Sequence, residues 1–342
     1  MDVSEGCENI PIYLDKRDRK ERSPVFQYTK CNIPGPGTDT EDFVSQFQGC
    51  DCHSVCLPDT CPCIQRFGPS YNNEGQLICT TISLCDKPVY ECNRECKCSI
   101  QCSNRIVQIG VQFKLQVRNT DSDKGFGLYA LETIPKDHFV CEYAGEVLTQ
   151  EEAKRRTKAL KHADMNYIFV LREHIHLVQA DHSNVPPKEG KHVASTEYRH
   201  EPANGNIHVA LNEDMHVTPN ENMHVHLASN EDIQLAPNEV LTTYIDPTRI
   251  GNVGRFINHS CGPNLYIVPV RVDNSVPKLA LFASRDIFAG EELSFNYSGS
   301  SGPVPKSTEN DCVVSLRKLC HCGYADCQGF LPFDESLFDS DA

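Results

Sequence analysis

The alternation of apolar and polar residues predicts a chain built mainly of short β-strands. Residues Phe113–Val117 alternate with a period of two, and Tyr167–Leu171 is typical of a second strand. Further strands are expected over Lys278–Ser284 and around Leu293–Tyr297. The charges of Gln150–Lys161 recur at helical spacing, which predicts one surface helix. We therefore expect a mainly β fold, of the β-rich α+β class.

Residues 176–240 break this pattern and form a low-complexity segment. Near-repeats begin at Asn212, Asn220 and Asn230, and nine of the 14 histidines fall between His174 and His226. A connection of this length is unusual inside a compact domain. A metal-binding or pH-sensing role is one interpretation. The repeated composition favours the other interpretation, a polar loop that arose by repeat expansion.

The 342 residues suffice for one large domain or two smaller ones, and 39% of them are hydrophobic. No apolar run reaches eighteen residues, so no membrane-spanning helix is expected. The first six residues lack the basic-then-apolar order of a secretion signal. We therefore expect an intracellular protein.

The 19 cysteines are unevenly distributed, and residues 103–260 contain only Cys141. A disulfide framework and metal sites in a reducing compartment are the two alternatives. Clustering without a secretion signal favours zinc. Two tight clusters hold nine cysteines: Cys50, Cys52, Cys56, Cys61, Cys63, Cys92, Cys96, Cys98 and Cys102.

Ligand counting predicts the form of this metal site. Three tetrahedral zinc ions need twelve zinc–sulfur bonds, and nine thiolates supply twelve if three of them bridge two ions each. We therefore expect a cluster of three zincs and nine cysteines. Cys79 and Cys85 lie outside the spacing pattern and are interpreted as unliganded.

A second metal site is predicted near the end of the chain. Cys320, Cys322 and Cys327 provide three ligands, and a tetrahedral zinc ion needs a fourth. Cys261 is the candidate, within the stretch Gly251–Asn264 that also holds an amide, an imidazole and an arginine. One zinc ion would then tie this stretch to the C-terminal tail.

The formal net charge of −15 bears on the choice of partner. An acidic surface repels nucleic acid and attracts basic molecules. A basic peptide substrate therefore fits better than direct DNA binding, although solubility alone would also explain the charge.

The five-plus-four arrangement of cysteines resembles the pre-SET module of SET-domain histone-lysine methyltransferases. The resemblance covers about residues 48–333, apart from the low-complexity segment. Further motifs resemble the cofactor loop, the E-Y-x-G-E strand, the R-F-x-N-H-S-C segment, the catalytic-tyrosine strand and the post-SET zinc motif of this family: Lys124–Leu128, Cys141–Glu146, Arg255–Cys261, Leu293–Tyr297 and Cys320–Cys327.

The resemblance implies a SET domain of small curved sheets, flanked by a pre-SET three-zinc cluster and a post-SET zinc tail. The expected organisation is a lead-in at 1–47, the pre-SET cluster at 48–111, the SET domain at 112–299 with an insertion at 176–240, a linker at 300–318 and the post-SET tail at 319–333.

The resemblance also implies an activity: methyl transfer from S-adenosylmethionine to a lysine of a histone tail, with H3 favoured. The zinc ions would be structural, because cysteines fill every coordination position. Chromatin as partner, and the nucleus and chromosomes as location, follow from the same resemblance. The alternative is a catalytically silent SET-domain scaffold on chromatin.

The family motifs assign roles to individual residues. Tyr297 is the first catalytic candidate, with Tyr143 and Phe295 as walls of the lysine channel. A tyrosine at the Phe295 position restricts methylation in this family, so phenylalanine predicts di- or trimethylation. Glu146 is expected to be a structural partner. The cofactor-binding candidates are Lys124, Gly125, Phe126, Tyr167, Arg255, Asn258, His259 and Phe330.

Two positions depart from the family pattern. Gly262 stands where an acidic residue commonly follows the zinc cysteine, and Asn296 stands where aspartate usually precedes the tyrosine. Neither replaces a candidate catalytic group.

Overall fold

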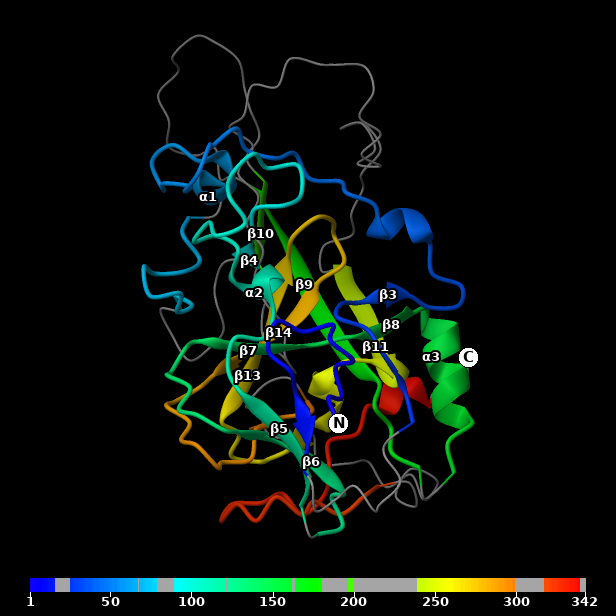
Figure 1. Cartoon of the computed structure of the whole chain (residues 1–342). Coiled ribbons are helices and arrows are strands. Elements are labelled where there is room, and N and C mark those ends of the chain that lie inside the picture. Colours follow the sequence, from blue (N-terminus) through cyan, green and yellow to red (C-terminus); the bar gives the residue numbers. More distant parts are fainter. Residues whose placement is uncertain are drawn as a thin grey trace.

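The computed structural model describes residues 1–15, 25–66, 68–78, 89–120, 122–161, 164–179, 196–199, 239–298 and 317–338 (Figure 1). Strands dominate these ranges and form several small sheets, which confirms the expected mainly β class. Cys79, Cys85, most of the predicted insertion and most of the predicted linker lie outside the described residues. In the part described, no helix is long and apolar enough to cross a membrane.

The largest sheet contains the ends of the predicted insertion. Its strand order is β10-β9-β11-β8-β3, and β2 pairs separately with β11. The strands span Thr196–Arg199 (β10), Phe169–Gln179 (β9), Glu239–Gly251 (β11), Gly145–Leu148 (β8), Ile33–Pro34 (β3) and Gln27–Tyr28 (β2). The strand predicted at Tyr167–Leu171 thus begins at Phe169 and is longer than expected.

A second sheet joins the cysteine-rich part of the chain to the rest. Its order is β4-β13-β14-β7. The strands span Val89–Tyr90 (β4), Leu265–Arg271 (β13), Lys278–Ala283 (β14) and Phe139–Tyr143 (β7). The strand predicted at Lys278–Ser284 is therefore confirmed to within one residue.

Two smaller sheets complete the set. One has the order β1-β5-β6, with Tyr13–Leu14 (β1), Leu115–Asn119 (β5) and Phe126–Ala130 (β6). The other pairs Asn258–His259 (β12) with Ser294–Phe295 (β15). The strand predicted at Phe113–Val117 is β5, which starts two residues later.

The predicted surface helix is α3, Gln150–Lys158. The Thr149 side chain accepts a hydrogen bond from the backbone N–H of Glu152, which satisfies a free donor at the helix start. Acidic residues in its first turn and basic residues in its last turn complement the helix dipole. Ala153 and Thr157 form its buried face.

The other helices are single turns. They are α1 (Pro62–Gln65), α2 (Ile106–Ile109) and the 3-10 helices η2 (Thr40–Phe43), η4 (Val253–Phe256) and η5 (Glu335–Leu337). In Figure 1 the cysteine-rich segment around α1 lies at the upper left, and the red helix η5 lies beside α3.

A buried ion pair connects the two larger sheets. Arg271 on β13 donates two hydrogen bonds, of 2.7 and 2.8 Å, to the carboxylate of Glu173 on β9. The Glu173 side chain is fully buried, and that of Arg271 is 7% exposed. A buried charge without its partner is strongly destabilising, so this pair fixes β9 relative to β13.

Candidate active site and cysteine clusters

Strands β12 and β15 bring together the two segments with the strongest candidate chemistry. They run parallel, with Asn258 opposite Ser294 and His259 opposite Phe295. The backbone N–H of Ser260 continues the pairing by donating to the Phe295 carbonyl at 3.1 Å. This register places the Asn258–Cys261 segment directly beside the strand that leads into Tyr297.

Four aromatic rings cluster at this junction. The ring centroid of Phe295 lies 5.7 Å from that of Tyr143, 6.1 Å from that of Phe169 and 4.9 Å from that of Tyr297. Phe295 is almost fully buried and Tyr143 is buried. The structure thus brings the three predicted channel residues together and adds Phe169.

Both phenol groups of this aromatic cluster donate to backbone carbonyls. The Tyr297 hydroxyl donates to the Ile257 carbonyl at 3.0 Å, and the Tyr143 hydroxyl donates to the Tyr167 carbonyl at 2.6 Å. Burial raises the pKa of both phenols well above the ordinary tyrosine value. Both groups therefore stay protonated near neutral pH and offer oxygen lone pairs rather than a negative charge.

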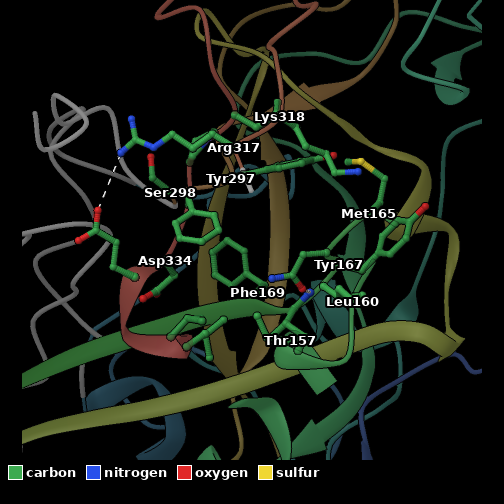
Figure 2. A pocket seen from close by; sticks show the side chains of 18 of the residues that line it. Thr157, Leu160, Met165, Tyr167, Phe169, Tyr297, Ser298, Arg317, Lys318 and Asp334 are labelled. Atoms are coloured by element: carbon green, nitrogen blue, oxygen red, sulfur yellow. Dashed lines mark hydrogen bonds and ion pairs between the residues drawn. The ribbon is translucent and has the colours of Figure 1, made fainter. Parts of the chain in front are cut away.

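The four aromatic residues face a cavity of about 800 Å³, within the usual range for small-molecule sites. It lies between the segment 157–172 and the C-terminal residues 317–338. Figure 2 shows Arg317 and Lys318 on one side, Thr157 and Leu160 on the other, and the rings of Phe169 and Tyr297 between them. Of the predicted cofactor residues, Tyr167, Arg255 and Phe330 line this cavity.

The other predicted cofactor residues form a hydrogen-bonded group next to the cavity rather than in its lining. The Asn258 side-chain amide donates to the Phe126 carbonyl at 3.1 Å. Lys124 does not point to open space, because its ammonium group lies 2.6 Å from Glu292. Gly125 has φ +74°, a left-handed conformation that favours glycine in this loop.

His259 lies between the backbone of Tyr297 and the sulfur of Cys261. Its Nδ1 atom accepts a hydrogen bond from the backbone N–H of Tyr297 at 3.2 Å, and its Nε2 atom lies 3.4 Å from the Cys261 sulfur. Burial lowers the pKa of His259 to about 4, so the ring is neutral near neutral pH. A neutral imidazole is consistent with Nδ1 acting as an acceptor.

Arg255 is held by stacking and backbone contacts. Its guanidinium lies 4.4 Å from the centre of the Phe26 ring and 5.0 Å from that of Tyr167, and its Nε donates to the Pro247 carbonyl at 3.1 Å. Such cation–π contacts attach the lead-in segment at Phe26 to the cavity wall. The sequence interpretation did not foresee this contact of Phe26 with Arg255.

Glu146 has the structural role expected from the sequence. Both of its carboxylate oxygens accept from the Arg156 guanidinium, at 2.7 and 3.1 Å. Arg156 also bonds Asp246 on β11 and Glu152 in its own helix, at 2.8 Å each. The network anchors α3 to the sheet that bears the cavity.

The sulfurs of the N-terminal cysteines gather into overlapping groups. Three sets of four cysteines have all their sulfur atoms within 4.8 Å of one another: Cys50, Cys56, Cys61 and Cys92; Cys50, Cys63, Cys92 and Cys96; and Cys56, Cys92, Cys98 and Cys102. Cys50, Cys56 and Cys92 each belong to more than one set, as expected of thiolates that bridge two zinc ions. Cys52 packs against the cluster but belongs to none of the three sets.

The sulfur spacing suits tetrahedral zinc. Zinc–sulfur bonds of about 2.3 Å in a tetrahedron separate neighbouring sulfurs by about 3.8 Å. The Cys50–Cys56 and Cys56–Cys92 sulfurs are 3.6 Å apart, and the Cys63–Cys96 sulfurs are 3.7 Å apart. The donor set therefore fits the metal that its residue types predict.

The C-terminal cysteines form a fourth group of four with the predicted partner. The sulfurs of Cys261, Cys320, Cys322 and Cys327 all lie within 4.8 Å of one another. The Cys261 sulfur is 4.0 Å from those of Cys320 and Cys327. The stretch Gly251–Asn264 and the tail therefore meet as the sequence predicts. We call this group of four cysteines the clasp.

The structure explains the first departure from the family pattern. A Cβ atom on Gly262 would lie 2.3 Å from the Tyr324 ring, so the ring of the tail covers this glycine closely. Asn296, the second departure, accepts hydrogen bonds from the backbone and hydroxyl of Ser298 at 3.1 and 2.7 Å. The amide thus supports the turn after the Tyr297 strand.

The sequence interpretation missed contacts of the last described residues. Asp334 forms an ion pair with Arg172 at 2.7 Å, the rings of Phe333 and Phe338 stack at 4.5 Å, and Leu337 is buried. The apolar positions around Leu337, in an otherwise polar end, could have indicated this docking. Phe169 could have been found because it falls on the same face as Tyr167 in the strand predicted at Tyr167–Leu171.

Comparison with known proteins agrees with the observed fold. A family model for the SET domain matches residues 125–298, and a model for the Pre-SET motif matches residues 4–105. The chain belongs to the SET-domain histone-lysine N-methyltransferases. Its similarity to histone-lysine N-methyltransferase SETMAR of Bos taurus is 39% identity over 345 residues, covering 99% of this chain and 91% of that protein.

Solved structures give the same result. The methyltransferase domain of human SETMAR has a TM-score of 0.66 and 36% identity, covering 97% of this chain and 98% of that one. Arabidopsis thaliana SUVH6 in complex with SAM has a TM-score of 0.61 and 27% identity, covering 96% of this chain and 55% of that one. The expected family is therefore confirmed.

The Gly262–Tyr324 contact leads to a testable outcome. A Gly262→Asp substitution is expected to displace the Tyr324 ring and to loosen the tail, because the new Cβ cannot fit beneath it. Hydrogen exchange of residues 317–338 should accelerate. The double variant Gly262→Asp with Tyr324→Ala should restore the slower exchange, and equal exchange in all three proteins would contradict the contact.

Proposed function

We propose that this protein transfers methyl groups from S-adenosylmethionine to the amine of a lysine in a histone tail, with H3 favoured. The observation that supports this most is the aromatic cluster of Tyr143, Phe169, Phe295 and Tyr297 on a cavity next to the Lys124–Gly127 loop. Chromatin in the nucleus is the corresponding location, and the charge of −15 suits a basic peptide better than direct contact with DNA.

The aromatic rings would act on the lysine side chain. A lysine amine is mostly protonated at neutral pH and must lose a proton before it attacks. Burial between Tyr143, Phe295 and Tyr297 disfavours the ammonium form and lowers its pKa. The Tyr297 and Tyr143 oxygens, fixed by their bonds to backbone carbonyls, can accept hydrogen bonds from the amine and direct its lone pair.

The cofactor residues fall into two groups by position. Tyr167, Arg255 and Phe330 line the cavity, and Lys124, Gly125, Phe126, Asn258 and His259 lie beside it. S-adenosylmethionine, when bound, supplies an electrophilic methyl group on a sulfonium. Phe330 is 44% exposed, so its ring is free to cover an adenine on the tail side of the cavity.

The zinc ions would have structural roles. We assign three to the nine-cysteine cluster and one to Cys261, Cys320, Cys322 and Cys327. Cysteine sulfurs fill the coordination sphere of each ion, so no position remains for a reactive water. The C-terminal ion would hold Phe330 and the rest of the tail against the cavity.

Methyl transfer to peptides tests the proposed activity. The zinc-loaded protein with tritiated S-adenosylmethionine should label an H3 peptide on a histone peptide array. Tyr297→Phe should lower the rate by about a hundredfold, the cost typical of losing one positioned polar group at a reacting centre. Tyr266→Phe removes a partly buried hydroxyl outside the cavity, bonded to Asp137, and should leave the rate unchanged.

A wild-type protein that labels no histone peptide would contradict the proposed activity. If it still bound S-adenosylhomocysteine, a different protein substrate would be indicated. If it bound neither cofactor nor peptide, the silent scaffold would replace the enzyme.

The degree of methylation tests the role of Phe295. Its ring is almost fully buried against Tyr297, so a hydroxyl added there would take space from a methylated amine. Mass spectrometry should find di- or trimethylated product for the wild type and mainly monomethylated product for Phe295→Tyr. Phe288→Tyr, at an exposed position, is the control. Purely monomethylated product from the wild type at long times would refute this role.

Replacing Cys261 tests the proposed clasp. Cys261→Ser should lower the zinc content from about four ions per chain to about three, since one ligand set is broken. S-adenosylhomocysteine affinity should fall about tenfold or more, because the tail no longer holds Phe330 over the cavity. Metal analysis and calorimetry measure both effects. Cys7→Ser, at an exposed cysteine, should change neither. Full affinity in Cys261→Ser would count against the clasp.

A further inference from the structure

A single carboxylate, that of Glu292, joins two of the proposed cofactor residues. Its Oε2 atom lies 2.6 Å from the Lys124 ammonium, and its Oε1 atom accepts from the Asn258 side-chain amide at 2.9 Å. The side chains of Lys124 and Glu292 are only 20% and 23% exposed. Both oxygens are therefore engaged, one with each residue, in a partly water-excluded position.

The backbone of Glu292 is held on both sides. It forms an isolated antiparallel bridge with Tyr129 on β6, and its carbonyl accepts from the Asn264 side chain at 2.9 Å. The next residue, Leu293, donates to the Leu128 carbonyl at 2.7 Å. The carboxylate thus projects from a segment held on both sides, and it reaches the Lys124–Gly127 loop.

Glu292 and Asn258 both pack closely against Gly127. A Cβ atom on Gly127 would lie 3.0 Å from Glu292 Oε1 and 3.2 Å from Asn258 Nδ2. The glycine lets the carboxylate and the amide approach the backbone of the loop. The contact of the loop with Glu292 and the contact of Asn258 with the loop therefore both depend on the glycine at position 127.

Glu292 also determines which way the Asn258 amide points. The amide nitrogen has two hydrogens, and they go to the Phe126 carbonyl and to Glu292 Oε1. Both partners are acceptors, so the amide cannot be turned around without placing oxygen against oxygen. No donor in the described part of the chain bonds the Asn258 Oδ1 atom. That oxygen is left as an acceptor with a fixed direction.

We infer that Glu292 is a positioning residue for the cofactor: it orients the Asn258 amide so that Oδ1 accepts from the α-ammonium group of S-adenosylmethionine, and it closes the loop through Lys124. The ammonium is the charged donor of the cofactor and forms the stronger type of hydrogen bond. This inference rests on the proposed function. It also changes the role of Lys124 from cofactor contact to loop anchor.

Calorimetry on the zinc-loaded full chain tests the inference with two ligands. S-adenosylhomocysteine carries the α-ammonium group, and 5′-methylthioadenosine lacks it. Glu292→Gln places an amide donor against the Lys124 ammonium or against the Asn258 amide, which are themselves donors. The substitution therefore breaks one of the two contacts of Glu292. We expect S-adenosylhomocysteine to bind about tenfold more weakly or worse, while 5′-methylthioadenosine binds as it does to the wild type.

The neighbouring glutamate is a matched control. Glu291 pairs with exposed Arg285 at 2.7 Å and takes no part in the loop. Glu291→Gln should leave the affinities for both ligands unchanged. Lys124→Met combined with Glu292→Gln should bind S-adenosylhomocysteine better than Glu292→Gln alone, because no ammonium remains without its carboxylate.

Three outcomes would overturn the inference. Unchanged S-adenosylhomocysteine affinity in Glu292→Gln would remove the positioning role. An equal loss of affinity for both ligands would show a general structural effect. If the double variant did not recover affinity for S-adenosylhomocysteine, Lys124 and Glu292 would not act as a pair. A wild-type chain that binds neither ligand would instead refute the proposed function.

Discussion

The short parallel pairing of β12 with β15 is the contact on which the site depends. It sets Asn258 beside Ser294 and His259 beside Phe295, and a shift of one residue would turn each side chain to the opposite face. Buried neighbours hold this register, because Ile257, Leu293 and Phe295 are almost completely shielded from water. In this register Tyr297 lines the cavity and Cys261 lies against the tail cysteines.

The cavity joins a rigid part of the molecule to a weakly anchored part. Its inner wall comes from strands whose side chains are largely buried, whereas Leu337 is the only buried residue among the described residues 317–338. Elements with few buried contacts open with little cost in free energy. The order of the tail must then come from the Cys261 group, the Arg172–Asp334 ion pair and the stacked rings of Phe333 and Phe338. Because tail residues also line the cavity, we expect tail order and ligand binding to be coupled.

Much of this was accessible from the sequence, because ligand spacing and short motifs are local properties. The family, the β-rich class and the meeting of Cys261 with the tail cysteines all followed from such patterns. Contacts between distant segments were not accessible. Nothing near Phe26 indicates that it stacks on Arg255, and nothing near Glu292 indicates its bonds to Lys124 and Asn258. These contacts arise from the order of strands in the sheets, which local patterns do not specify.

The position of the low-complexity segment explains how the fold accommodates it. Strands β9 and β11 are antiparallel neighbours, paired from Phe169 opposite Ile245 to Ile175 opposite Glu239. Their ends already lie side by side, so a longer connection costs only loop-closure entropy, about 0.6 kcal/mol for each doubling of length. The buried Arg271–Glu173 pair holds β9 two residues from the end of that paired stretch. We therefore expect a change in loop length to leave Phe169 and the aromatic cluster in place.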